Sequence, residues 1–150
     1  MNEVQKTLLL TGASRGIGHA TVSFFSEKNW EIITCSREAP PEECLRDLNW
    51  SHHITTDLAD TNSIDAFIKE ANAFLGERPL HGLVNNAGWS PKSPIQERLG
   101  CLNGNLDAWR TVFELNFFAP LRLARGFASS LTKGKGSIVN ITSIAGQIGK

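Results

Sequence analysis

The sequence predicts an α/β fold built on a doubly wound parallel sheet, and three observations lead to this prediction. Short runs of β-branched and aliphatic residues alternate with amphipathic helical patterns along the chain. The crossovers between these runs are long enough for helices, as a parallel sheet requires. No internal repeat, low-complexity stretch or linker divides the 150 residues, so we expect a single domain over residues 1–150.

The first half of the chain contains three predicted strands and a helix. Thr7–Thr11 (TLLLT) is the first strand, Glu31–Cys35 (EIITC) the second and His53–Thr56 a third, shorter one. Between the first two strands, apolar and small residues recur at helical spacing and predict one buried helix face. These residues are Ile17, Ala20, Thr21, Phe24 and Phe25. Asn29 supplies the expected end of this helix.

The second half contains two predicted helices and two predicted strands. A first apolar stripe, closed by Gly76, consists of Ile64, Phe67, Ile68, Ala71 and Phe74. Leu80–Asn85 is the fourth strand and Ser137–Thr142 (SIVNIT) the fifth. Asn105 can cap a long helix whose stripe consists of Trp109, Val112, Phe113, Leu123, Ala124 and Phe127. Right-handed crossovers between such strands place ligands at their carboxyl ends.

Composition argues against several classes of function. Fifteen basic residues balance fifteen acidic ones, so no long-range field favours nucleic acid or an anionic membrane. No apolar run approaches the ~18 residues of a membrane span, and the N-terminus does not resemble a secretory signal. Cys35, Cys44 and Cys101 are odd in number and lack C-x-x-C spacing, which favours reduced thiols in the cytoplasm. No histidine has metal-ligand spacing, so no metal site is expected.

Three glycines, Gly12, Gly16 and Gly18, lie between the first strand and the first helix. Glycine permits positive φ and close backbone approach, and a helix N-terminus offers unpaired N–H groups to an anion. The turn therefore predicts a pyrophosphate site, the alternative being a turn that is merely rich in glycine. Its spacing is G-x-x-x-G-x-G, and no P-loop motif occurs in the chain.

Together with later motifs, this turn resembles the classical short-chain dehydrogenase/reductase family, whose TGxxxGxG fingerprint it matches. Further matches are Asp57-Leu58, the NNAG motif at Asn85–Gly88, Asn116 and Ser143. The resemblance spans the chain and is closest to 3-oxoacyl-carrier-protein reductase-like members. It implies a Rossmann fold and hydride transfer between a nicotinamide cofactor and a small carbonyl or alcohol substrate.

The resemblance also implies the residues that bind the cofactor. They are Gly12, Ser14, Arg15, Gly16, Ile17, Gly18, Ser36, Arg37, Asp57, Leu58, Asn86, Ala87 and Gly88. Ser36 occupies the position where an acidic residue would select NAD. With Arg15 and Arg37 nearby, we expect NADP rather than NAD, because guanidinium groups bind phosphate strongly. The alternative to a phosphate site is two solvated surface arginines, with Glu38 offsetting part of the charge of Arg37. The alternative for Asn85 and Asn86 is a simple turn pair.

Asn116 and Ser143 are the candidate catalytic residues. Asn116 lies on the apolar stripe of the long helix, so we expect its amide to be buried and to need hydrogen-bond partners. Pro120 has no N–H, so the Asn116 carbonyl loses its regular helical partner and the helix should bend. The resemblance implies that this carbonyl holds a water in a proton relay, the alternative being a kink that serves packing. It also implies that Ser143 binds the substrate oxygen, the alternative being a serine in a strand-end turn.

The chain contains no tyrosine, so the family's Tyr-x-x-x-Lys pair is absent. We therefore expect the N-terminal portion of an NADP-dependent oxidoreductase, incomplete at its C-terminus and inactive by itself. The alternative is a short non-catalytic module that binds a nucleotide or a partner. The aromatic residues of the long helix should expose apolar surface and favour a homo-oligomer.

Overall fold

The computed structural model describes residues 5–40, 42, 50–93, 95, 99–100 and 102–144. Two of the three predicted free thiols, Cys44 and Cys101, lie outside the described residues, whereas Cys35 is a buried free cysteine.

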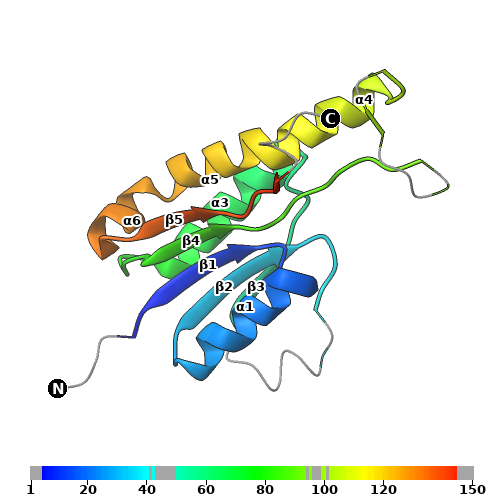
Figure 1. Ribbon diagram of the computed structural model, residues 1–150. Helices are drawn as coiled ribbons and strands as arrows, with labels where there is room; N and C mark the ends of the chain where they lie inside the picture. The colour runs from blue at the N-terminus through cyan, green and yellow to red at the C-terminus, as the bar shows by residue number, and fades with distance from the viewer. Residues whose placement is uncertain are drawn as a thin grey trace.

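A single five-stranded sheet forms the centre of the molecule (Figure 1). Its strands are β1 (Thr7–Thr11), β2 (Glu31–Ser36), β3 (Trp50–Thr55), β4 (Gly82–Asn85) and β5 (Ser137–Asn140). They run in the order β3-β2-β1-β4-β5, and every neighbouring pair is parallel. The predicted doubly wound parallel sheet is thus confirmed, because the strand order runs outward from β1 in both directions.

Strand β1 has the predicted boundaries, and the boundaries of the other strands differ from the predicted ones by one to three residues. The largest difference is at β3, which begins at Trp50 rather than His53; β4 begins at Gly82 rather than Leu80, and β5 ends at Asn140 rather than Thr142. The Leu80 N–H donates to the Ser130 carbonyl, 2.9 Å away, instead of entering the strand ladder. The backbone of Leu80 therefore connects the segment before β4 to the helix that contains Ser130.

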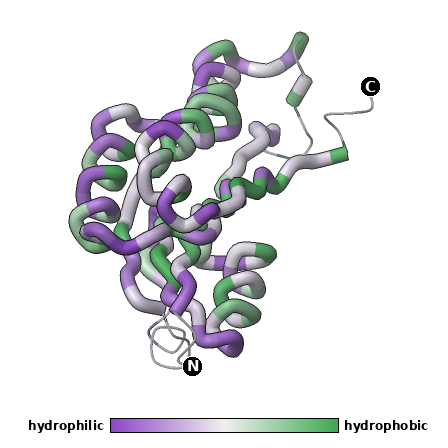
Figure 2. Tube along the Cα trace, turned by 90° about the vertical axis from the view of Figure 1, so that its left-hand side faces the viewer, coloured by the Kyte–Doolittle hydropathy of each residue, from purple (hydrophilic) through white to green (hydrophobic). Residues whose placement is uncertain are grey.

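Helices cover both faces of the sheet (Figure 1). They are α1 (Gly16–Glu27), α3 (Thr61–Leu75), α4 (Leu106–Phe113), the π-helical turn η1 (Glu114–Phe118), α5 (Ala119–Gly126) and α6 (Ala128–Gly134). One core cluster joins α1 to the sheet through Val22, Leu8 and Leu10, and another joins α3 and α5 to the opposite face. Hydrophilic and hydrophobic residues alternate along these helices (Figure 2), as expected where one helix face packs on a sheet.

The predicted buried face of α1 is wrong for most of its length, although Phe25 packs against the core cluster. Ile17 and Phe24 are 62% and 53% exposed, and the buried residues of this helix are Gly18 and Val22. A Cβ atom at Gly18 would lie 2.1 Å from the carbonyl oxygen of Gly12. The helix thus packs its glycine against the preceding turn, and this close approach rotates the larger side chains toward solvent.

The predicted long helix is confirmed in its cap and in its irregularity. Asn105 caps α4 by accepting a hydrogen bond from the Asp107 N–H at 2.7 Å. The helix then passes through the π-turn η1, where the Ala119 N–H donates to the Glu114 carbonyl, before continuing as α5. Pro120 follows immediately, so the π-turn lies where the missing N–H was expected to disturb the helix.

Candidate functional site

Two adjoining cavities lie at the carboxyl ends of the strands. The first, of about 630 Å³, is here called the glycine pocket. It is lined by Gly12, Ser14, Arg15, Gly16, Ile17, Cys35, Ser36, Arg37, Glu38, Thr56, Asp57, Leu58, Ala59, Asn86, Ala87, Gly88, Trp89, Thr111 and Leu115. All predicted cofactor-binding residues except Gly18 therefore line one cavity.

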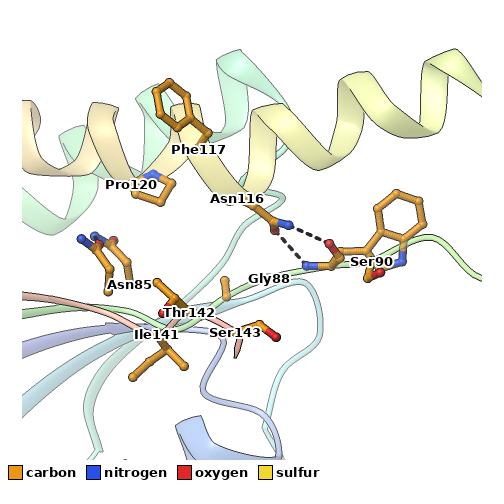
Figure 3. Close-up of a pocket in the computed structure, with 12 residues that line it drawn as sticks. Asn85, Gly88, Ser90, Asn116, Phe117, Pro120, Ile141, Thr142 and Ser143 are labelled. Carbon is orange, nitrogen blue, oxygen red and sulfur yellow. Dashed lines mark hydrogen bonds between the residues drawn. The ribbon is translucent and has the colours of Figure 1, made fainter. Parts of the chain in front are cut away.

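The second cavity, of about 770 Å³, is here called the serine pocket (Figure 3). It is lined by Asn85, Ala87, Gly88, Trp89, Ser90, Asn116, Phe117, Pro120, Asn140, Ile141, Thr142 and Ser143. Both predicted catalytic residues, Asn116 and Ser143, line it. Ala87, Gly88 and Trp89 line both pockets, so the segment after β4 forms the wall between them.

The three glycines of the first turn have different geometric roles. Gly12 has a φ of 71°, and a Cβ there would lie 2.9 Å from the Ala87 Cα. Gly18 is held against the Gly12 carbonyl, as described above, so two of the glycines serve close packing. Gly16 has a φ of 58°, but a Cβ there would meet no atom within 4 Å. The Gly16 backbone at the start of α1 therefore faces open space.

The NNAG segment is tied to the end of β1 by four hydrogen bonds. The Asn86 side-chain amide donates to the Thr11 and Gly12 carbonyls, each at 3.0 Å. The Thr11 hydroxyl oxygen accepts from the backbone N–H groups of Asn86 and Ala87, also at 3.0 Å. Asn86 thus holds the glycine turn in place, a role more specific than the simple turn pair considered from the sequence.

At the end of β2, Ser36 and Arg37 line the glycine pocket together with Ser14 and Arg15. Both arginines are exposed, whereas Ser36 is 8% exposed. The Ser36 hydroxyl donates to the Glu38 carbonyl at 2.6 Å, and its oxygen lies 3.3 Å from Nε2 of His53. His53 was not predicted as a site residue, because nothing in one sequence shows which residue of a neighbouring strand lies beside Ser36.

Asp57 and Leu58 contribute mainly to the architecture of the pocket. An Asp57 carboxylate oxygen accepts from the Ala59 N–H at 2.9 Å and so shapes the turn before α3. Leu58 is 7% exposed and its side chain belongs to the core beneath the pocket. Asp57 is exposed and also lines the glycine pocket.

Asn116 fastens helix η1 to the segment after β4 (Figure 3). Its side-chain oxygen accepts from the Trp89 N–H at 2.9 Å, and its amide donates to the Trp89 carbonyl at 2.7 Å. The side chain was expected to be buried, and this expectation is wrong because Asn116 is exposed. Its partners are supplied by a neighbouring loop rather than by the protein interior.

Ser143 follows β5 and lies on the opposite side of the serine pocket from Asn116 (Figure 3). The Asn85 amide donates to the Asn140 side-chain oxygen at 2.8 Å, which joins the ends of β4 and β5. Among the described residues, the Asn85 side-chain oxygen is buried without a hydrogen-bond partner. This unpaired oxygen, which was not predicted from the sequence, belongs to a residue that lines the serine pocket.

Two titratable groups near the glycine pocket have altered affinities for protons. Burial raises the pKa of the Cys35 thiol to about 12, so this wall of the pocket carries no reactive thiolate. Burial also lowers the pKa of His53, and the backbone carbonyl of Glu38 opposes this effect. In the described part of the chain, no group of three or more His, Cys, Asp or Glu residues could hold a metal ion. None of the described helices is both long and apolar enough to cross a membrane.

Comparison with known proteins gives a consistent result. A family model described as short chain dehydrogenase matches residues 6–150. The protein FixR of Bradyrhizobium diazoefficiens is 48% identical over 142 residues, which are 94% of this chain and 51% of the relative. The chain spans about half the length of the curated relatives it matches.

Solved structures agree with this result. A short-chain dehydrogenase/reductase family oxidoreductase from Brucella ovis, in complex with a partially ordered NAD, is 46% identical with a TM-score of 0.88. The match covers 98% of this chain and 67% of that one. A metagenomic short-chain oxidoreductase in complex with NADP is 28% identical with a TM-score of 0.77, covering 97% of this chain and 65% of that one.

Proposed function

The chain belongs to the short-chain dehydrogenase family, and on this premise we propose that it forms the nucleotide-binding portion of an NADP-dependent oxidoreductase. The observation that carries the proposal is the bare backbone of Gly16 at the start of α1, facing the glycine pocket. A Cβ would fill this space, and the pyrophosphate of a dinucleotide would occupy it in contact with helical N–H groups. When bound, the cofactor would supply hydride at its nicotinamide ring.

The residues predicted from the sequence are assigned to parts of this cofactor. Gly12, Gly16 and the first residues of α1 would hold the pyrophosphate, and Asp57 and Leu58 would lie near the adenine. Asn86, Ala87 and Gly88 would line the ribose toward the nicotinamide. The pocket volume of about 630 Å³ is typical of cofactor sites.

For the 2′-phosphate that distinguishes NADP from NAD, we assign Arg15 and Arg37. Both are exposed at the glycine pocket and carry fixed positive charge, so they suit a dianion better than a neutral hydroxyl. Glu38 on the same wall offsets part of this charge. NAD, which is bound in the Brucella ovis relative, is the competing cofactor.

The serine pocket would hold the carbonyl or alcohol substrate. The Ser143 hydroxyl would donate a hydrogen bond to the substrate oxygen and orient it. The Asn116 carbonyl would hold a water in a proton relay, since Pro120 offers it no N–H. With no tyrosine among the 150 residues, the chain lacks the Tyr-x-x-x-Lys pair and is proposed to be inactive by itself.

Titration of the purified 150-residue chain with NADPH, followed by nucleotide fluorescence and calorimetry, tests the proposal. We expect saturable binding to one site, together with no oxidation of NADPH when carbonyl compounds are added. Absence of binding to NADPH and NADH alike would contradict it. The alternative, a short non-catalytic nucleotide- or partner-binding module, would be favoured by a stop codon directly after codon 150.

Three further properties are part of the proposal. We propose a single domain over residues 1–150 that is incomplete toward its C-terminus, in keeping with the half-length match to relatives. The cytoplasm is the proposed location. Homo-oligomers are proposed because Phe113, Phe117 and Leu121 are 57%, 59% and 49% exposed along η1 and its flanking helices. The likeness to 3-oxoacyl-carrier-protein reductases stays a prediction.

A further inference from the structure

Three polar side chains on adjacent strands form a connected chain behind the wall of the glycine pocket. Nδ1 of His53 on β3 lies 2.7 Å from the Thr34 hydroxyl on β2, and its Nε2 lies 3.3 Å from the Ser36 hydroxyl. Ser36 in turn donates to the Glu38 carbonyl at 2.6 Å. We refer to Thr34, His53 and Ser36 as the β2–β3 polar chain.

The strand register explains why these side chains meet. Thr34 pairs directly with His53, and Ser36 follows two residues after Thr34 on the same face of β2. Ile32, two residues before Thr34, packs in the core cluster of α1, so the polar chain lies on the α1 face of the sheet. A register shift between Ile32 and Ile33 brings Trp50 of β3 to this face, where its ring contacts that of His53 at 5.9 Å.

The hydrogen-bond directions limit what Ser36 can offer to a ligand. A serine hydroxyl has one hydrogen, and Ser36 uses it on the Glu38 carbonyl. In this arrangement only a lone pair remains for the pocket, which suits a ribose hydroxyl that donates. An ionised 2′-phosphate has acceptor oxygens only, so it needs the Ser36 hydrogen to turn toward the pocket.

His53 is placed to free the Ser36 hydroxyl hydrogen from its hydrogen bond to the Glu38 carbonyl. The Glu38 carbonyl and Nε2 of His53 lie beside the same Ser36 hydroxyl, at 2.6 and 3.3 Å from its oxygen, and this carbonyl favours the protonated form of His53. If the ring N–H donates to this carbonyl, the carbonyl keeps a partner after Ser36 rotates. Without such a donor, rotation of Ser36 would leave the carbonyl short of a hydrogen bond.

We propose that His53 is a positioning residue that favours a 2′-phosphate over a 2′-hydroxyl by replacing Ser36 as the donor to the Glu38 carbonyl. This inference rests on the proposed binding of a nicotinamide dinucleotide in the glycine pocket. The residue acts through Ser36 and does not itself contact the nucleotide. Because binding and protonation are linked reciprocally, the 2′-phosphate raises the pKa of His53 and acid strengthens binding of the 2′-phosphate.

The elements around His53 carry mainly basic groups. These groups include Arg15 just before α1, His19 of α1, Arg37 after β2 and His52 of β3, with Glu38 as an acidic neighbour of Arg37. Positive charge on His52 opposes protonation of His53, and His52 is itself 3.2 Å from Glu70. A bound 2′-phosphate would add negative charge to this mainly basic environment and so favour the protonated form of His53.

Adenosine 2′,5′-bisphosphate and 5′-AMP, which differ only in the 2′-phosphate, test the inference by calorimetry on the 150-residue chain. His53→Phe removes the donor, and we expect the affinity ratio of bisphosphate to AMP to fall about fivefold at pH 6.5, with AMP binding retained. His53→Gln keeps an N–H donor that does not titrate. It should preserve the ratio at pH 8 but lose the increase at pH 6 that the unmodified chain shows.

His52→Gln is the matched control, because His52 is the adjacent histidine but stacks on Phe74 of α3 on the opposite face. It should leave the ratio and its pH dependence unchanged. An unchanged ratio in folded His53→Phe would overturn the inference. So would an equal effect of His52→Gln.

A second measurement needs no substitution. Nuclear magnetic resonance titration of the His53 ring in the unmodified chain should show its pKa raised by the bisphosphate and not by AMP. Equal pKa values with the two nucleotides would overturn the role of His53 while leaving the nucleotide site intact. Failure of both nucleotides to bind would overturn the proposed function and the inference together.

Discussion

Gly18→Ala is expected to destabilise the protein by about 3 kcal/mol. The new Cβ would lie 2.1 Å from the Gly12 carbonyl oxygen and 2.7 Å from the Asn86 side-chain nitrogen. Because the first of these atoms is backbone, α1 must move away from the turn, and overpacking of this kind costs up to about 3 kcal/mol. Loss of the Asn86–Gly12 hydrogen bond adds about 1 kcal/mol, and the better helix propensity of alanine returns about 1 kcal/mol.

Urea unfolding followed by circular dichroism measures this change directly. For a domain of this size the loss corresponds to a fall in melting temperature of about 6–12 °C. A Gly18→Ala protein within 0.5 kcal/mol of the unmodified chain would refute the close contact between α1 and the turn.

Gly16→Ala is the matched control, since its Cβ would meet no atom within 4 Å. The positive φ of Gly16 makes alanine about 1–2 kcal/mol less favourable, but without a clash. The methyl group would instead occupy the space assigned to the pyrophosphate, so NADPH affinity should fall about tenfold. Unchanged NADPH affinity in this variant would place the phosphates elsewhere.

Arg37→Asp should weaken NADPH binding more than NADH binding, as measured by calorimetry. The control Arg125→Asp on α5 should change neither affinity, and equal losses for the two cofactors in Arg37→Asp would exclude Arg37 from the phosphate site. His81 accepts a hydrogen bond from a backbone N–H through Nδ1, and burial lowers its pKa, so the unfolded chain takes up this proton first. Stability should therefore be complete above about pH 6.5 and decline as the pH falls below it. Urea unfolding at pH 7.5 and 5.5 measures this decline, which His81→Asn should reduce. Phe117→Ser should shift an associated form of the chain toward monomer, as measured by the molar mass in light scattering. An unchanged molar mass would show that Phe117 is not part of the contact.

Much of the fold could be predicted from the sequence, because each signal for it is local. Apolar runs identify parallel strands buried on both faces, and Asn105 identifies a helix start by its own side-chain chemistry. The grouping of Gly12, Ser36 and Asn86 at one cavity follows once the strands are known to be parallel, since their carboxyl ends meet at one edge.

The errors arose where tertiary contacts override local patterns. The apolar stripe of α1 was misplaced because Gly18, with no side chain to contribute to a stripe, makes the closest contact of the helix. Asn116 was expected inside the protein since its neighbours in sequence are apolar, but its partner is Trp89, 27 residues earlier. His53 was missed for the same reason: its role depends on strand register.

The two hydrogen bonds between Asn116 and Trp89 connect the exposed π-turn η1 to the wall between the two pockets. The π-turn that carries Asn116 also carries Phe117, which is 59% exposed. A partner that displaced this turn would also displace the backbone of Trp89, which lines both pockets. The fluorescence of Trp89 should therefore change when a partner binds the exposed surface around Phe117.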